Sequence, residues 1–171
     1  MNTRRLVVAL ICLGIAALTW PSVHIPVARI VYNPSDSVPP GWYRIGLPDS
    51  MHVGSIVLVQ LPTDAAALAA QRGYLPEHIP LLKRIGAMSS QQVCIEKHIV
   101  RIDGVAVADV RATDRRGRSL SAWQQCRRLH EGELFLLSAT NPASFDSRYF
   151  GPISVSAVIG NAQPLWTWST P

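Results

Sequence analysis

The chain contains very few lysines. Only Lys83 and Lys97 occur among its 171 residues, against 14 arginines. Any chemistry that needs a lysine amine is therefore restricted to two positions. Charged residues make up 16% of the chain, below the ~25% of ordinary soluble domains, while hydrophobic residues make up 48%. This balance argues against disorder and indicates a membrane-associated portion in a chain about one domain long.

Several common catalytic signatures are absent. The sequence has no G-x-S-x-G elbow, no G-x-x-x-x-G-K phosphate loop, no G-x-G-x-x-G and no H-E-x-x-H. The α/β-hydrolase, nucleotide-binding and zinc-protease functions therefore lose their usual support. The histidines stand singly, which favours surface or structural roles; they are His24, His52, His78, His98 and His130. No metal or organic cofactor is indicated.

The net charge of +5 and the pI near 9.6 would suit nucleic acid or an anionic membrane surface, but the arginines are scattered. Their densest group, Arg115, Arg116 and Arg118 around Gly117, lies in a segment that we expect to be a solvated loop, residues 113–121. No aromatic residues alternate with these arginines to stack on bases. We therefore predict no nucleic-acid partner.

Residues 1–23 are expected to form a signal or membrane anchor. Arg4 and Arg5 precede an uncharged run of 15 residues, Leu6–Trp20. This is shorter than the ~20 residues that span a bilayer, although the uncharged stretch continues for three more residues. No A-x-A cleavage pattern follows it, which favours a retained anchor over a cleaved signal peptide. Residues 24–171 would then lie on the periplasmic face of a bacterial inner membrane, or free in the periplasm if the segment is removed.

The three cysteines are consistent with export. Cys12 lies in the apolar run, whereas Cys94 and Cys126 lie in the translocated part, where disulfides persist. We predict a Cys94–Cys126 disulfide; the alternative is two buried free thiols. No C-x-x-C motif or Cys/His spacing supports a zinc site.

The translocated part is predicted to be a mainly β, antiparallel domain with a short helical insertion. Asp103-Gly104 favours a tight type I′ hairpin between two of the strands. The helix is expected over Asp64–Arg72, with Thr63 as N-cap and Gly73 as terminator. The expected strands are Ser55–Leu61, Leu81–Ile85, Val93–Ile102, Val105–Val110, Glu133–Ala139 and Ile153–Ile159.

Lys83 is the better candidate for a catalytic amine. In its strand it shares a face with Leu81 and Ile85, so apolar neighbours would desolvate it and lower its pKa. Lys97 also alternates with isoleucines, but its immediate neighbours are a glutamate and a histidine, which indicate a solvated strand. To act as a base near neutrality, a lysine needs its pKa lowered by ~3 units, at a cost of ~4 kcal/mol.

Three segments follow one another in a suggestive order: residues 35–43 (SDSVPPGWY), 82–86 (LKRIG) and 144–151 (SFDSRYFG). Taken alone, the first has the composition of a Pro/Ser/Gly turn. Together with the apolar segment ahead of them, they resemble the signal peptidase family with a serine–lysine dyad, most closely its TraF-type branch of conjugative-transfer peptidases. The resemblance extends over essentially the whole chain and implies a signal-peptidase-like β domain.

The resemblance also implies roles for individual residues. Ser37 would be the nucleophile and form an acyl-enzyme, and Lys83 would take and return the proton. The backbone N–H of Ser37 and the hydroxyl of Ser35 would form the oxyanion hole. Catalysis of this kind needs neither a metal nor a cofactor.

The closing segment would support this dyad. Ser144 would orient the Lys83 amine, and Asp146 would support the site and pair with Arg148. In the TraF-type branch the matching aspartate is treated as a third catalytic member; the alternative is a structural ion pair. The sequence departs from the general signal peptidases at residues 138–141, SATN in place of a Gly-Asp-Asn-Arg run, and after Gly86. Both departures favour the conjugative branch.

The resemblance thus implies a membrane-anchored serine endopeptidase that processes a secreted precursor, the pilin subunit of a conjugative type IV secretion system, with cyclisation of the pilin as a further outcome. Two alternatives stay open: a general signal peptidase that acts on many preproteins, and a non-catalytic periplasmic scaffold of the transfer machinery. The expected partners are the precursor protein and the membrane. The sequence gives no prediction of oligomeric state.

Overall fold

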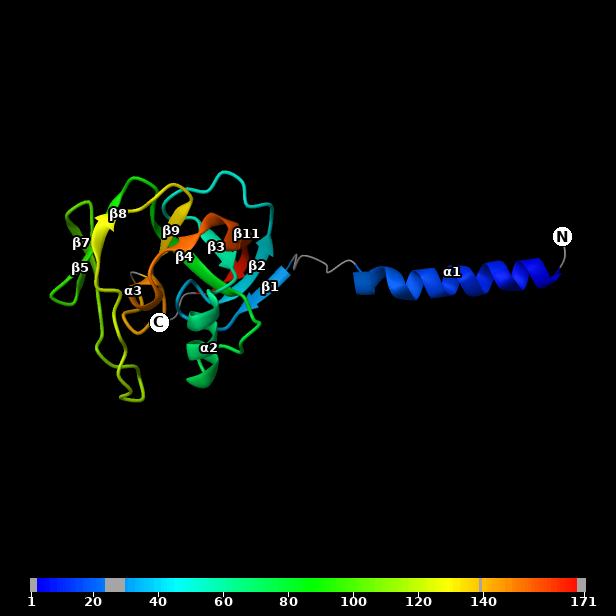
Figure 1. Ribbon diagram of the computed structural model, residues 1–171, viewed down its shortest axis with the longest axis horizontal. Helices are drawn as coiled ribbons and strands as arrows, with labels where there is room; N and C mark the ends of the chain where they lie inside the picture. Colours follow the sequence, from blue (N-terminus) through cyan, green and yellow to red (C-terminus); the bar gives the residue numbers. More distant parts are fainter. Residues whose placement is uncertain (1–2, 24–29, 139, 169–171) are drawn as a thin grey trace.

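The computed structural model describes residues 3–23, 30–138 and 140–168. Two antiparallel sheets form the domain that follows α1 (Figure 1). The larger sheet has the order β1 (Ile30–Asn33), β2 (Gly41–Ile45), β11 (Val158–Thr167), β3 (Ile56–Val59), β4 (Leu81–Met88), β9 (Glu133–Leu136) and β10 (Ile153–Ser154). The smaller has the order β7 (Val105–Asp109), β6 (Ile99–Ile102), β5 (Gln92–Glu96) and β8 (Cys126–Arg128). The helices are α1 (Thr3–Val23), α2 (Thr63–Gln71), α3 (Ser147–Phe150) and the 3-10 turn η1 (Val155–Ala157).

The predicted mainly β, antiparallel architecture is confirmed, with corrections to individual strands. The span Val93–Ile102 is two strands, because Lys97 and His98 adopt positive φ angles of 51° and 64° and turn the chain between β5 and β6. Residues 153–159 are also not one strand, since η1 separates β10 from β11. The final predicted residue of the 133–139 strand, Ala139, lies outside the described residues. The strands β1, β2 and β8 and the extension of β11 to residue 167 were not predicted.

The turn and helix predictions have mixed outcomes. Asp103 and Gly104 adopt φ angles of 49° and 83° between the paired residues Ile102 and Val105, as a type I′ hairpin requires. The helix α2 lies where it was expected, but Thr63 is already its first helical residue. Its N-cap is Pro62, which offers no side-chain hydrogen bond, so the predicted cap is wrong.

Apolar residues of the large sheet form the core beneath the candidate site. One buried cluster joins the residues next to Ser37 and Lys83 to β2, β3 and β11; its members are Val38, Tyr43, Ile45, Leu58, Leu82 and Ala162. Close packing also explains the glycine after the lysine segment. A Cβ on Gly86 would lie 2.8 Å from Cβ of Leu137, where β4 bulges against the β9 region. The strand that carries Lys83 is therefore fixed on both sides.

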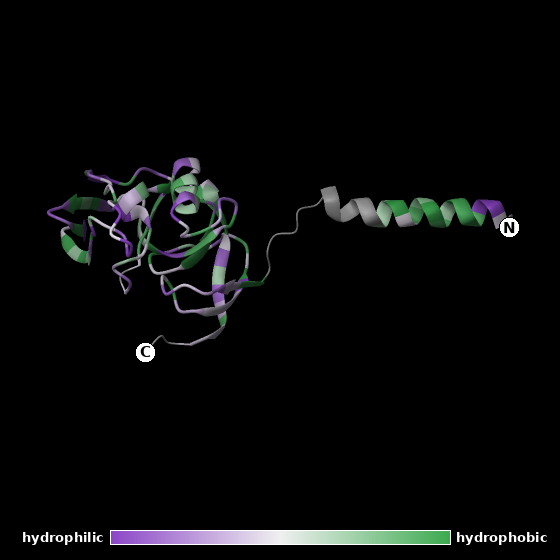
Figure 2. Ribbon diagram, turned by 90° about the horizontal axis from the view of Figure 1, so that it is seen from below, coloured by the Kyte–Doolittle hydropathy of each residue, from purple (hydrophilic) through white to green (hydrophobic). Residues whose placement is uncertain are grey.

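The helix α1 exposes its apolar side chains. Leu10 is 59% exposed, Leu13 69% and Ile15 57%, and Figure 2 shows hydrophobic residues recurring along this helix. Among the described residues, no helix meets both the length and the mean hydropathy expected of a membrane-spanning segment. The boundary predicted at residues 23 and 24 adjoins residues 24–29, which lie outside the described ranges.

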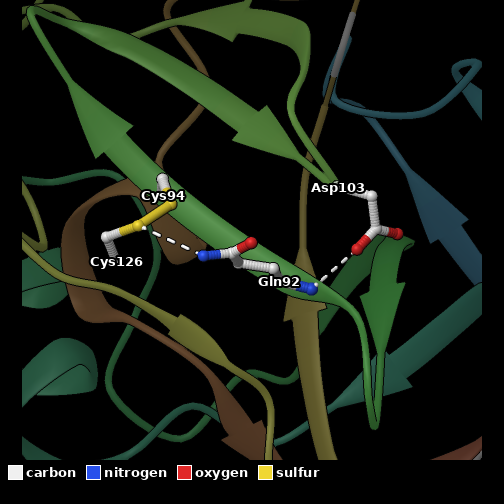
Figure 3. Close-up of a disulfide and its surroundings, with 4 residues drawn as sticks. All are labelled: Gln92, Cys94, Asp103 and Cys126. Atoms are coloured by element: carbon white, nitrogen blue, oxygen red, sulfur yellow. Dashed lines mark hydrogen bonds between the residues drawn. A yellow bond between two sulfur atoms is a disulfide. The ribbon is translucent and has the colours of Figure 1, made fainter.

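Cys94 and Cys126 are direct cross-strand partners on β5 and β8. Figure 3 shows their sulfur atoms joined, with the side-chain amide of Gln92 donating a 3.7 Å hydrogen bond to Sγ of Cys126. Cys12 is unpaired and exposed. The arrangement agrees with the predicted pairing, and the oxidation state in solution stays a prediction.

Candidate active site

Ser37 lies in the seven-residue loop that joins β1 to β2. Prolines at 34, 39 and 40 keep this loop out of the β ladder, because proline lacks the N–H that a ladder needs. Gly41 then starts β2 with a φ of 146°, and a Cβ there would lie 2.2 Å from the carbonyl oxygen of Trp166. A glycine is thus required at the point where the loop rejoins the sheet. Ser37 is 9% exposed and lines a cleft.

Asn33 holds this loop in shape. Its side-chain nitrogen donates to the carbonyl oxygens of Ser35 at 2.8 Å, Val38 at 3.1 Å and Pro39 at 3.3 Å. Its side-chain oxygen accepts from the backbone N–H of Ser35 at 3.1 Å and from the Ser35 hydroxyl at 2.8 Å. Asn33 was not among the predicted site residues; the only signal for it in the sequence was an asparagine before a proline-rich turn.

Lys83 points from β4 to Ser37. Its side chain is 1% exposed, and Nζ donates a hydrogen bond of 2.6 Å to Oγ of Ser37. Nζ also donates to Oγ of Ser144, and the two serine oxygens lie 3.3 Å apart. The structure therefore brings together three residues that are separated by 46 and 61 positions in the chain.

The surroundings of Lys83 favour its neutral form. Burial is the largest cause and lowers the pKa of Lys83 from 10.5 to about 8, because the charged amine loses its hydration. Asp146 raises this pKa, Arg148 lowers it and Asp36 raises it, each by a smaller amount. Lys97, by contrast, lies exposed in the turn between β5 and β6.

Asp146 and Arg148 form a fully buried ion pair beside the site. Asp146 caps α3 by accepting from the backbone N–H of Arg148, and its two carboxylate oxygens accept from the guanidinium at 2.8 Å each. Oδ2 of Asp146 also accepts from the backbone N–H of Ser138 at 3.0 Å. Arg148 further donates to the carbonyl oxygens of Asn141 and Ser144 at 3.1 Å. The pair thereby fixes the loop that presents the Ser144 hydroxyl.

The hydroxyl of Ser35 donates its hydrogen bond to the side-chain oxygen of Asn33. It would have to rotate away from Asn33 to donate to an oxyanion. The backbone N–H of Ser37 is the other predicted donor. Both residues line the same cleft as Lys83.

Asp36, the residue between the two serines, ties the loop to distant parts of the chain. Oδ1 accepts a 2.6 Å hydrogen bond from the side-chain amide of Asn141, and Oδ2 lies 3.1 Å from the guanidinium of Arg115. Neither Asp36 nor Asn141 was among the predicted site residues. The hydrogen bond from Asn141 holds the Ser37 loop against the loop that carries Ser144.

The cleft above the dyad has a volume of about 990 Å³ and is lined mostly by apolar residues. Its far wall combines α2 and the following residues 72–81 with the loop of residues 114–120. These two segments lie on the same side of the domain in Figure 1. The cleft is large enough to hold a short peptide segment, and Ser37, Lys83 and Ser144 lie in its lining.

A mainly β domain with a buried lysine between two serines defines a signal-peptidase-like class. The chain belongs to the family described as signal peptidase, peptidase S26, which it matches over residues 3–168.

Its relatives in this family include conjugal transfer proteins. The chain is 37% identical over 146 residues to the conjugal transfer protein TraF of Agrobacterium fabrum, which covers 80% of this chain and 81% of the relative. It is 29% identical over 167 residues to a plasmid transfer protein TraF of Escherichia coli, covering 91% and 92%. A crystal structure of a signal peptidase I from Enterococcus faecalis superposes with a TM-score of 0.42 and 19% identity, over 68% of this chain and 98% of that one.

Proposed function

We propose that the chain is a serine endopeptidase in which Ser37 is the nucleophile and Lys83 the general base. The observation that carries this proposal is the 2.6 Å contact between Nζ of a 1% exposed lysine and Oγ of Ser37. A lysine with a pKa of about 8 is neutral in about one molecule in ten at pH 7, against about three in ten thousand at the ordinary value. Burial therefore supplies a base that an exposed lysine would not.

The reaction follows from these contacts. Neutral Lys83 takes the proton of Ser37 as Oγ attacks the substrate carbonyl, and the oxyanion is met by the backbone N–H of Ser37. The protonated amine then gives its proton to the leaving nitrogen, which leaves an acyl-enzyme. A second nucleophile, water or the amino group of the substrate itself, loses its proton to Lys83 and releases the acyl group. Ser144 holds the amine in position through both steps.

The substrate we propose is a secreted precursor of a conjugative system, such as a pilin subunit. The relatives are conjugal and plasmid transfer proteins, and this supports the choice. We further propose that α1 keeps the enzyme at the membrane, with the catalytic domain on the periplasmic face. The exposed apolar side chains of α1, such as those of Leu10 and Leu13, support membrane association because an exposed apolar patch is typical of a membrane-interaction surface.

The test of the proposed chemistry compares substitutions at the two lysines. Ser37→Ala and Lys83→Arg should each abolish processing of a co-expressed pilin precursor, because alanine lacks the nucleophile and arginine does not give up its proton. Lys97→Arg is the matched control and should process the precursor normally, since Lys97 lies exposed in a turn. Continued processing by both Ser37→Ala and Lys83→Arg would leave the non-catalytic scaffold as the explanation.

Two further measurements separate the related activities. In a strain depleted of the enzyme, accumulation of a single precursor supports the specialised peptidase, and accumulation of dozens supports a general signal peptidase. The mass of the mature product distinguishes its release: a product lighter by one water than the linear chain indicates cyclisation. Carbonate extraction of membranes, with and without residues 1–23, tests the anchor.

A further inference from the structure

The cleft carries an unbalanced group of arginines that the proposed chemistry does not use. Asp36 and Asp114 are its acidic lining residues, so the arginines exceed them by two positive charges, without counting Lys83. The arginines lining the cleft are Arg72, Arg115, Arg116 and Arg118.

The hairpin that carries three of these arginines is held in a defined shape. The carboxylate of Asp114 accepts from the backbone N–H groups of Arg116 and Arg118 at 2.9 Å each, and Thr113 and Ser119 form a bridge across the hairpin. Gly117 supplies the positive φ of 75° that the turn needs. These contacts give the hairpin a defined conformation.

The hairpin is also fixed to the opposite insertion. The Tyr74 hydroxyl donates a 2.5 Å hydrogen bond to Oδ2 of Asp114, and Arg72 donates to the carbonyl oxygen of Ser119 at 2.8 Å. Arg118 donates in return to the carbonyl oxygen of Arg72 at 3.0 Å and forms an ion pair with Asp114 at 2.7 Å. Arg118 is occupied by these contacts, whereas Nη1 of Arg72 lies 3.6 Å from Oδ2 of Asp114 and is buried without a hydrogen-bond partner among the described residues. Burial raises the pKa of Asp114, but the hydrogen bonds that its carboxylate accepts from Tyr74, Arg118 and Arg116 together bring it below its usual value.

Arg115 and Arg116 have exposed side chains that can face a ligand. Arg116 donates through its backbone N–H to Asp114, and its exposed side chain has no hydrogen bond or ion pair with any described residue. Arg115 contacts Asp36 at 3.1 Å, with both side chains exposed, at 66% and 44%. Such a pair exchanges partners readily because it contributes little in water. A carboxylate in the cleft would therefore meet Arg116 directly and compete with Asp36 for Arg115.

We propose that this wall of the cleft is a subsite for a carboxylate of the substrate, close to the bond that is cut. The inference rests on the proposed peptidase function and names the charge of its substrate. The carboxylate has two sources, an Asp or Glu side chain or the free carboxyl end of the chain. Because Arg115 contacts Asp36, the residue next to Ser37, the subsite lies beside the Ser37 loop.

The test measures peptide binding to the full-length Ser37→Ala protein in a neutral detergent, so that it does not depend on turnover. Four fluorescent decapeptides with an Ala-Gly centre are compared: two glutamates or two glutamines on one side, each with a free or an amidated carboxyl end. The glutamate peptide should bind about five-fold more tightly than its glutamine counterpart at low salt, and this preference should shrink as salt is added. An effect of amidation alone would assign the subsite to the chain end.

Substitutions locate the effect. Arg116→Gln should lower the preference for the glutamate peptide about three-fold. Arg116→Glu should instead prefer a fifth peptide, in which lysines replace the two glutamates. Arg44→Gln, with the same loss of charge on the exposed face of β2 and outside the cleft, is the matched control and should keep the preference.

Equal affinities for charged and neutral peptides, no measurable binding of the charged ones, or an equal effect of Arg44→Gln would overturn the subsite. Tighter binding of a single-stranded oligonucleotide than of the glutamate peptide would assign the arginines to nucleic acid and also overturn it. If the wild-type enzyme cleaves these peptides without regard to charge, the subsite fails while the proposed function stands.

Discussion

The buried amine of Lys83 should make both the activity and the stability of the protein depend on pH in a predictable window. Lowering its pKa from 10.5 to about 8 corresponds to about 3 kcal/mol, at about 1.4 kcal/mol for each pKa unit. If Lys83 is the general base, kcat/KM follows its neutral fraction. This fraction rises about ten-fold between pH 7 and pH 9 and then levels off. An amine with the ordinary pKa would instead give a rise of about a hundred-fold over the same range and no plateau.

The same shift predicts how stability changes. Between pH 8 and pH 10.5 the unfolded chain binds more protons at this lysine than the folded protein, so the free energy of unfolding should rise with pH and lose up to about 3 kcal/mol as pH falls back to 8. Below pH 8 the amine is charged in both states and the effect is constant. Tyr43 and Tyr149, whose pKa values burial raises, oppose this trend above pH 10. The difference between wild type and Lys83→Met therefore isolates the lysine.

The assay combines a pH series of kcat/KM on a fluorogenic peptide with urea unfolding of wild type and Lys83→Met from pH 7 to pH 10. Lys83→Met should be inactive and should lack the rise in stability that wild type shows above pH 8. A rate that climbs without a plateau to pH 10, or two parallel stability curves, would refute the reasoning that burial makes Lys83 a base.

Two further predictions concern the surroundings of the dyad, and a third concerns the disulfide. Ser144→Ala removes one of the two hydroxyls that accept from Lys83, so kcat should fall about ten-fold with KM unchanged and Ser144→Thr should restore part of it; steady-state kinetics on one peptide checks this, and a change confined to KM would contradict it. Asn33→Ala leaves three loop carbonyls without their donor and should lower the free energy of unfolding by about 2 kcal/mol while reducing kcat, measured by urea unfolding and kinetics; an unchanged midpoint would contradict the role of Asn33. Thiol titration of the unfolded, unreduced protein should find one free thiol, Cys12, and three after reduction; three without reduction would show that Cys94 and Cys126 are not joined.

The parts of the fold that follow from local patterns could be predicted from the sequence. The alternation around Lys83 correctly placed it on a buried face, and the Asp103-Gly104 pair correctly placed a tight hairpin. The break between β5 and β6 could not be predicted in this way. It depends on left-handed backbone at Lys97 and His98, which residues other than glycine adopt only when the surrounding structure demands it.

The candidate site was only partly predictable because most of its contacts join distant parts of the chain. Recognition of the three segments brought Ser37, Lys83 and Ser144 together, and the structure places them in hydrogen-bond contact. Nothing local in the sequence pairs Asp36 with Asn141, 105 residues further on. That contact exists only after the large sheet has brought the β1–β2 loop against the loop that precedes α3.

The buried ion pair near the dyad has to satisfy two opposing requirements. Arg148 must be charged to hold the carbonyl oxygens of the loop around Ser144, yet a lone buried cation would disfavour the protonated form of Lys83, and a lone buried carboxylate would favour it. Asp146 raises the pKa of Lys83 and Arg148 lowers it, so the pair together leaves burial as the deciding influence. Within the described residues, the carboxylate of Asp146 bonds to Arg148 and to the backbone of Ser138, and no hydrogen bond joins it to Lys83. These contacts favour a positioning role for Asp146: it balances the charge that fixes the loop, and in the proposed mechanism the proton transfer is left to Lys83.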